Sequence, residues 1–225
     1  MIATLGGAAL LAGALFAPMA VLLLLGSGRD PSGRTRAAGA RALHLACGLV
    51  ILSTLTLLLA LVTRDFSLDY VAHYTSTKLP AAYALTSLWA GNDGSLLFWS
   101  AILCGYILWV HGATRKEPGP VPPSAWAVMA GLLTFFTWLI LVHANPWRVL
   151  PVPAEEGMGL NPQLQNPAMM YHPPTLYMGY VGMCVPFAFA LGALIHRRLD
   201  ARWIRLTRRW TLTAWFFLAA GNLMG

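Results

Sequence analysis

Residues 42–63 read ALHLACGLVILSTLTLLLALVT, and this run decides the fold class. It holds no aspartate, glutamate, lysine or arginine. A helix of this length rises about 1.5 Å per residue and covers the roughly 30 Å hydrocarbon core of a bilayer. The run therefore predicts a membrane-spanning α-helix.

Similar apolar runs follow on both sides of this one, at residues 2–26, 95–113, 124–144, 175–195 and 210–225. The first run has no basic residues ahead of it, which favours a span over a signal peptide. The whole chain is 57% hydrophobic and 10% charged, whereas soluble domains average roughly 45–50% and about 25%. We expect an all-α, polytopic integral membrane helix bundle with about six transmembrane helices, forming a single transmembrane domain over residues 1–225.

The last run, at 210–225, is shorter than the others. Its residues cover only about 24 Å as a helix, less than the roughly 30 Å of the hydrocarbon core. This shortfall predicts that the chain is a fragment or one product of a split gene, with the remainder of the fold absent.

Basic residues divide unequally among the loops between these runs. The first, third and fifth loops hold twelve of the fifteen lysines and arginines, and only Arg64, Lys78 and Arg148 lie in the other two. The positive-inside rule then places the N-terminus, and with it segments 64–94 and 145–174, on the external side. The same distribution explains the net charge of +7 without nucleic acid. The arginine-rich fifth loop is interpreted as a topology anchor, with lipid head groups or an acidic partner as alternatives.

The two external segments are long and rich in aromatic residues, which predicts two structured loops that carry the function. In the first, residues 65–71 alternate like a short extended piece, and Pro80 is expected to open a short amphipathic helix. Its end reads WAGNDGSLLFW, residues 89–99. Trp89 and Trp99 are either interfacial anchors or an aromatic platform for a flat apolar ligand. The turn between them contains the residues Gly91, Asp93 and Gly94, of which the aspartate either caps the third span or pairs with a basic group on a partner.

The second external segment ends in NPAMMYHPPTLYMGY, residues 166–180. Pro173 and Pro174 are expected to start the fifth helix, with His172 at its mouth. A neutral imidazole is a good iron ligand, and a polar anchor is the alternative for His172. The remaining histidines are interpreted as structural, and the three cysteines as small core residues; they are His44, His73, His111, His143, His196, Cys47, Cys104 and Cys184.

These motifs carry a resemblance. The stretches DFSLDYVA, WAGNDGSLLFW, GLNPQLQNPAMMYHPPTLYMGYVG and RRWTLTAWFF, in this order, resemble the N-terminal third of the CcmF family of cytochrome c maturation proteins. CcmF proteins are haem-lyase subunits within the superfamily of haem-handling membrane proteins. The resemblance implies that His172 is an axial ligand of external haem b, and that Trp89, Trp99 and Tyr177 line the surface that meets haem or a partner. Gly91, Asp93, Gly94, Pro173 and Pro174 are assigned a structural or partner-contacting role.

The resemblance also implies an activity and partners. The chain is expected to be part of a multi-pass haem lyase of the bacterial inner membrane, which receives haem from a CcmE-like haem chaperone. The lyase would attach haem to the CxxCH cysteines of apocytochrome c on the periplasmic face, together with other maturation subunits and membrane lipid. The family usually has glutamate where Asp93 stands, and its tryptophan-rich haem segment and remaining haem histidines are expected after residue 225. The chain would then supply one axial ligand and depend on the absent C-terminal portion.

Two other classes of protein remain open at this point. The first is a non-catalytic scaffold that docks maturation partners while another chain holds haem. The second is a transporter, which is less favoured because no predicted span carries a central carboxylate. Haem that remains bound on purification would distinguish the lyase from the scaffold, and substrate flux in vesicles would identify a transporter.

Overall fold

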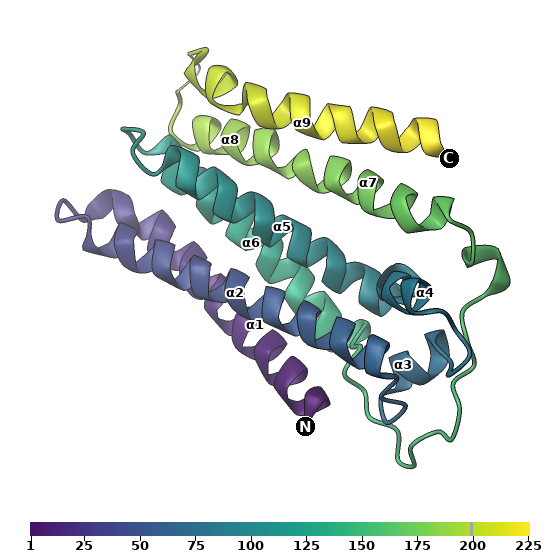
Figure 1. The fold of residues 1–225 in the computed structure, drawn as a ribbon. Helices are drawn as coiled ribbons and strands as arrows, with labels where there is room; N and C mark the ends of the chain where they lie inside the picture. The colour runs from purple at the N-terminus through teal and green to yellow at the C-terminus, as the bar shows by residue number, and fades with distance from the viewer. Residues whose placement is uncertain (199) are drawn as a thin grey trace.

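Long apolar helices account for most of the chain in the computed structural model, which describes residues 1–198 and 200–225 (Figure 1). The long helices are α1 Ile2–Gly26, α2 Arg34–Thr63, α5 Asn92–Thr114, α6 Val121–His143, α7 Ala168–Gly182, α8 Cys184–Ile195 and α9 Arg202–Met224. Short elements connect them: η1 Ser27–Arg29, α3 Asp69–Tyr74, α4 Ala81–Thr86, η2 Ser87–Trp89 and η3 Pro162–Leu164.

Five helical segments of the described chain are long and apolar enough to cross a membrane; these are 2–29, 34–63, 92–114, 121–143 and the combined α7–α8 segment 168–195. The prediction of an all-α multi-pass membrane bundle is confirmed. The sixth predicted run lies in α9, which has 23 residues and starts at Arg202 rather than at 210. Four arginines in the first half of α9 make this helix too polar to count among the five candidate membrane-spanning segments. The helix at the second predicted span also starts earlier, at Arg34 instead of 42.

The helices form two connected groups in Figure 1. In one group α1 pairs with α2 and α6, and α5 fills the space beside α2 and α6. In the other, α9 runs antiparallel along α7 and α8, and α8 joins the groups by packing on α6. Small residues allow close approach: Gly39 lies against Leu24, and Gly13 against Val50. This is the usual way in which membrane helices gain van der Waals contact.

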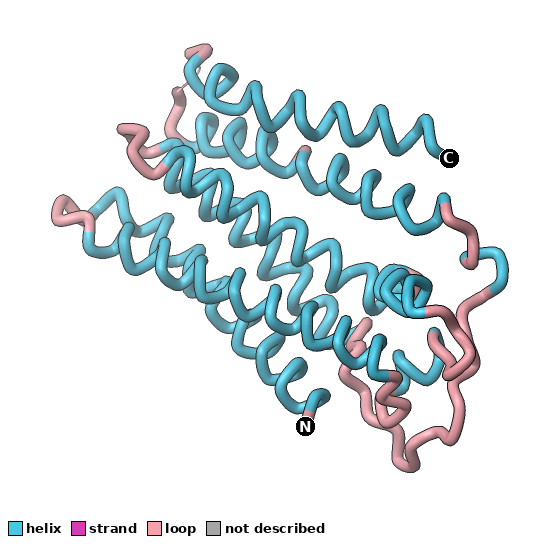
Figure 2. The backbone as a smooth tube through the Cα atoms, in the orientation of Figure 1, coloured by secondary structure: helices cyan, strands magenta, loops and turns pink. Residues whose placement is uncertain are grey.

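The two segments predicted to be external, 64–94 and 145–174, lie side by side at one end of the bundle, where Figure 2 shows most of the loop structure. Leu68 pairs with Val149 as a single antiparallel bridge, and the Met158 amide donates to the Ala72 carbonyl at 2.7 Å. The prediction of an extended piece over 65–71 holds only at Leu68, because helix α3 begins at Asp69. The predicted helix after Pro80 exists as α4, which spans only Ala81–Thr86. The two external segments therefore form one hydrogen-bonded layer.

Arg64 positions the start of this layer. It ends α2 in the left-handed conformation, with φ 55°. Its guanidinium donates to the carbonyls of Ser76 at 2.9 Å and Leu79 at 2.8 Å. Because carbonyls are obligatory acceptors, one arginine satisfies two loop groups and holds segment 64–79 against the end of α2.

Trp147 anchors the second external segment to the helices. Its side chain is buried, and its indole Nε1 donates to Ser53 Oγ at 3.0 Å. The Ser53 hydroxyl in turn donates to the Gly6 carbonyl at 2.9 Å. The indole ring occupies the space that a Cβ at Gly6 would need. The loop after α6 is thus fixed to α1 and α2 by one inserted aromatic ring.

Replacing Trp147 by alanine should lower the free energy of unfolding by about 3–5 kcal/mol. The substitution empties a packed site and removes the N–H that donates to Ser53 Oγ. The measurement is detergent-mediated unfolding of the purified protein. The matched control is Trp138→Ala on α6, whose side chain is 43% exposed and should change stability little. Equal destabilisation by both substitutions would show that Trp147 is not an anchor.

Candidate functional site

Helix α7 carries His172, and it starts earlier than the sequence predicts. The Asn166 side chain accepts from the Ala168 amide at 3.0 Å, and Pro167 leads into the first turn. Pro167 takes the cap position with a backbone already in the helical region, so the helix begins at the next residue. Pro173 and Pro174 lie inside α7 rather than at its start, and the prediction that they open the helix is wrong.

Pro173 has a specific consequence for the backbone of α7. A proline has no N–H, so the carbonyl four residues earlier in the helix loses its usual donor. That carbonyl belongs to Met169, and the indole Nε1 of Trp89 donates to it at 3.1 Å. The two motifs singled out in the sequence are therefore joined directly. The stretch 166–180 supplies the unpaired Met169 carbonyl, and the stretch 89–99 supplies the Trp89 donor.

Trp89 begins a row of three aromatic rings next to this hydrogen bond. Its ring stacks on Phe98 at a centroid distance of 5.3 Å, and Phe98 meets Tyr177 edge to face at 6.0 Å. Trp99 does not join the row, because it packs against Phe136 of α6 at 4.2 Å. Of the three predicted aromatic site residues, the structure brings Trp89 and Tyr177 together. The connecting residue, Phe98, was missed although it lies within the WAGNDGSLLFW motif.

His172 points from α7 toward α9, where its Nδ1 lies 3.0 Å from the Gly221 carbonyl oxygen. A carbonyl oxygen only accepts hydrogen bonds, so Nδ1 must carry the proton. In the neutral ring this leaves the lone pair on Nε2. An imidazole whose Nδ1–H donates to a backbone carbonyl is the usual arrangement for a histidine that binds a metal through Nε2. Gly225, just past α9, lies against the same edge of the ring, where an added Cβ would be 2.5 Å from Cε1 and 3.0 Å from Nε2. The donor chemistry therefore fits one axial ligand of a haem iron, once Gly225 moves off Nε2.

Glycines bring α7 and α9 close enough for this contact. A Cβ on Gly179 would lie 2.5 Å from Leu218, and one on Gly221 would lie 2.6 Å from Leu176. Side chains at these positions would separate the helices and move the Gly221 carbonyl away from the histidine. Gly221 was missed as a site residue. The available signal was the matching of small residues on the two helices, which is typical of close membrane-helix contacts.

Gly91 and Gly94 accommodate the tyrosines of α3. The Tyr70 hydroxyl donates to the Ser87 carbonyl at 2.8 Å and accepts from the Gly91 amide at 3.2 Å. Burial raises the pKa of Tyr70 far above its usual range, so the hydroxyl remains protonated and able to donate. A Cβ on Gly91 would collide with the Tyr74 ring, and one on Gly94 with the Tyr70 hydroxyl. Both glycines are thus required for packing.

Asp93 does not cap the third span as one alternative predicted. Gly91 occupies the cap position of α5, and no side chain makes a capping hydrogen bond there. Asp93 is instead a half-buried residue of the first helical turn, where a carboxylate interacts favourably with the helix dipole. Burial, together with the negative charges of Asp93 and Asp69, raises the pKa of Tyr74. A role in contacting a partner's basic group stays a prediction.

An open groove of about 350 Å³ lies beside this region, in the external layer. It is lined by His73, Tyr74, Ala90, Met158, Gly159, Leu160, Asn161, Pro162 and Leu164. A smaller cavity of about 50 Å³ next to it includes Trp89 and Met169. The bundle and this end of it define a class: a multi-pass helical membrane protein with an aromatic row and a helix-held histidine beside an ordered layer of loops.

Comparison with known proteins narrows the class. A family model described as "Cytochrome C assembly protein" matches residues 89–225. The cytochrome c-type biogenesis protein CcmF of Escherichia coli is 41% identical over 76% of this chain and 27% of its own length. CycK of Rhizobium meliloti is 42% identical over 91% of this chain and 30% of its own length. A solved structure, "Cytochrome c Heme Lyase CcmF", superimposes with a TM-score of 0.84 at 32% identity, over 100% of this chain and 36% of that chain.

The chain belongs to the cytochrome c assembly protein family, and the resemblance to CcmF seen in its motifs is confirmed. It spans about a third or less of the relatives it matches.

The link between Trp89 and Pro173 can be tested by a double-mutant cycle. Trp89→Phe keeps an aromatic ring but removes the donor to Met169, and should cost about 1 kcal/mol of unfolding free energy. In a Pro173→Ala background residue 173 regains its N–H, so the same Trp89→Phe change should cost clearly less. Unfolding in detergent measures both values.

Trp99→Phe, which leaves the Met169 contact untouched, is the control and should cost the same in either background. An equal cost of Trp89→Phe with and without Pro173 would mean that the missing proline N–H does not create the acceptor.

Proposed function

We propose that this chain is part of a membrane haem lyase in cytochrome c biogenesis. In this proposal the lyase receives haem from a CcmE-like chaperone and attaches it to the CxxCH cysteines of apocytochrome c. The observation that carries the proposal is the His172–Gly221 contact, which leaves the lone pair of the imidazole on Nε2. Membership of the cytochrome c assembly family supports it.

The residues of this chain would bind and orient haem rather than transfer protons. His172 would be one axial ligand, and its imidazole ring would be oriented by α7, which carries it, and by the Gly221 carbonyl of α9. The row Trp89–Phe98–Tyr177 offers apolar aromatic surface of the kind that packs against a flat ring system. Haem supplies the vinyl groups to which cysteine thiols add as thioethers, and positioning of the two reactants is the catalytic contribution assigned to the protein.

The second axial ligand and the tryptophan-rich surface are proposed to come from the part of the relatives that this chain does not span. An apolar face is available for such an addition on α9, where Leu212, Trp215 and Phe216 are each more than half exposed. Further helices packed on this face would complete the site around His172.

We also propose the orientation and location. Segments 64–94 and 145–174 would lie on the periplasmic side of the bacterial inner membrane, since the basic residues are concentrated at the other end. The layer formed by these segments would then be the surface that meets the haem chaperone, the apocytochrome and other maturation subunits.

The alternative is a scaffold that docks maturation partners without touching haem. The close packing of the external layer, with its loop-to-loop hydrogen bonds, suits a rigid docking surface as well as a haem site. The distinction lies in whether His172 binds iron.

The test is the optical spectrum of the protein purified in detergent after co-expression with the haem chaperone and with the remaining portion of a CcmF relative. A Soret band is expected in the wild type, and His172→Ala should lose most of it because the iron loses an axial ligand. His143→Ala, at an exposed position at the end of α6, should keep the band. A full Soret band in His172→Ala would remove the assignment, whereas folded protein without haem in every sample would favour the scaffold.

A further inference from the structure

The opposite end of the bundle contains a cationic groove that the proposed haem chemistry does not use. It has a volume of about 350 Å³ and lies between the start of α2, the end of α5 and the start of α6. Its lining consists of Gly33, Arg36, Ala37, Ala40, Arg41, His44, His111, Arg115 and Trp126. Three arginines and two histidines line the groove, with no acidic residue among them.

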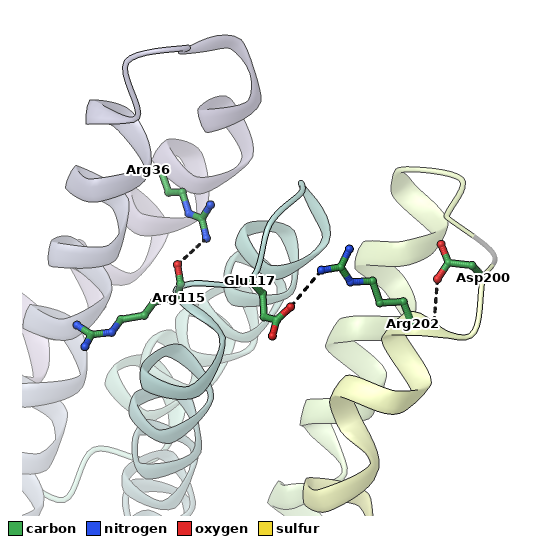
Figure 3. Close-up of polar contacts among 5 residues, drawn as sticks. All are labelled: Arg36, Arg115, Glu117, Asp200 and Arg202. Atoms are coloured by element: carbon green, nitrogen blue, oxygen red, sulfur yellow. Dashed lines mark hydrogen bonds and ion pairs between the residues drawn. The ribbon is translucent and has the colours of Figure 1, made fainter.

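These arginines are not neutralised by the protein itself. Among residues 1–198 and 200–225 the ion pairs are Arg148–Asp69 and Arg202–Glu117, neither of which involves the groove. Figure 3 shows Arg36 donating to the Arg115 carbonyl, while the Arg115 guanidinium extends away from Glu117. Asp30, just before α2, has its carboxylate engaged by Ser32 and Thr35. Hydrogen bonds from both residues hold the pKa of Asp30 well below its usual range.

The floor of the groove is rigid. Trp126 is 2% exposed, and its Nε1 donates to Thr114 Oγ1 at 3.0 Å. The Arg36 guanidinium lies 4.9 Å from the centre of the Trp126 ring. The His111 and Trp126 rings pack edge to face, with 4.5 Å between their centroids. Cation–π contact of this kind holds an arginine in place while leaving its other N–H groups free.

The two histidines add a donor. His44 Nε2 and His111 Nδ1 are 3.0 Å apart, so in the neutral pair one of these nitrogens donates and the other accepts. Either choice of tautomers leaves one outward N–H on the pair, at His111 Nε2 or at His44 Nδ1. The groove therefore presents hydrogen-bond donors and positive charge to whatever occupies it.

Apolar surface continues from the groove along the same two helices. Leu45 and Leu52 of α2 and Leu108 of α5 are exposed. A Cβ added at Gly48 or Gly105 would meet no atom within 4 Å. A cationic groove at the end of two membrane-spanning helices, with exposed apolar surface below it, matches the two parts of a phospholipid.

We infer that this groove binds the phosphate head group of an anionic phospholipid, with the acyl chains along α2 and α5. Anionic head groups attract clustered arginines at the membrane surface, and guanidinium groups recognise phosphate through paired N–H donors. The exposed leucines of α2 and α5 favour a lipid over a free phosphate, because a phosphate ion has no apolar part to pack against them. By the positive-inside rule this end faces the cytoplasmic leaflet.

The test is a titration of the purified protein in neutral detergent with fluorescent phosphatidylglycerol. The groove variant is Arg36→Gln/Arg41→Gln/Arg115→Gln. The matched control is Arg29→Gln/Arg205→Gln/Arg208→Gln, which removes equal charge from exposed positions at the same end. The groove variant should bind about tenfold or more weakly, and the control variant should bind like the wild type.

Competitors and a second variant complete the experiment. Unlabelled phosphatidylglycerol should displace the probe, whereas phosphatidylcholine and inorganic phosphate at the same concentration should not. Equal weakening in both triple variants would show diffuse surface charge, and equal displacement by phosphate would show a free-anion site; either result overturns the proposal. If the groove variant does not fold, Arg115→Gln alone, just past the end of α5, should weaken binding about fivefold. Unchanged binding there would also overturn it.

Discussion

The end of the bundle that carries segments 64–94 and 145–174 depends on a hydrogen-bond donor that is missing. Pro173 cannot donate, so the carbonyl of Met169 is left open in the wall of α7. Trp89, which comes from the first external segment, fills that position. Without the proline the carbonyl would be paired inside the helix, and the indole would compete with the backbone for it. One absent N–H thus connects two segments that lie eighty residues apart in the chain.

The same region of α7 is constrained from the other side by α9. Gly179 and Gly221 allow the two backbones to approach, and the approach brings the Gly221 carbonyl to His172 Nδ1. The imidazole direction is therefore set by two helices rather than by a loop. Ligand positions built on helices are held more accurately than positions on loops. Tyr177 of the aromatic row Trp89–Phe98–Tyr177 lies on the same helix as His172, α7, which fixes the distance along the helix between the histidine and the row.

Composition and apolar run length were sufficient to predict the bundle, because a lipid environment permits few other structures for such a chain. The sequence motifs also contain Trp89, Gly91 and Gly94, whose contacts the structure shows, while the ligand role of His172 stays a prediction. The start of the helix that carries His172 was predicted wrongly, because two stretches of sequence carry equivalent signals for a helix start. Both Asn166–Pro167 and Pro173–Pro174 can start a helix, and the helix starts at the first pair, where Pro167 takes the cap position and Asn166 accepts from the Ala168 amide. Partners across helices, such as Phe98 and Gly221, depend on tertiary contacts that no local pattern contains.

The nature of the partner of His172 has a chemical consequence for the proposed haem site. A carboxylate on Nδ1 would pull the proton away and give the ring imidazolate character, which stabilises ferric iron. A neutral backbone carbonyl fixes the same tautomer with a weaker pull. An iron bound at Nε2 would then keep a higher reduction potential, since axial ligand basicity and its hydrogen bonding are among the protein's means of adjusting it. Thioether formation in the proposed function requires reduced iron, so the carbonyl of Gly221 is the better of the two partners for this task.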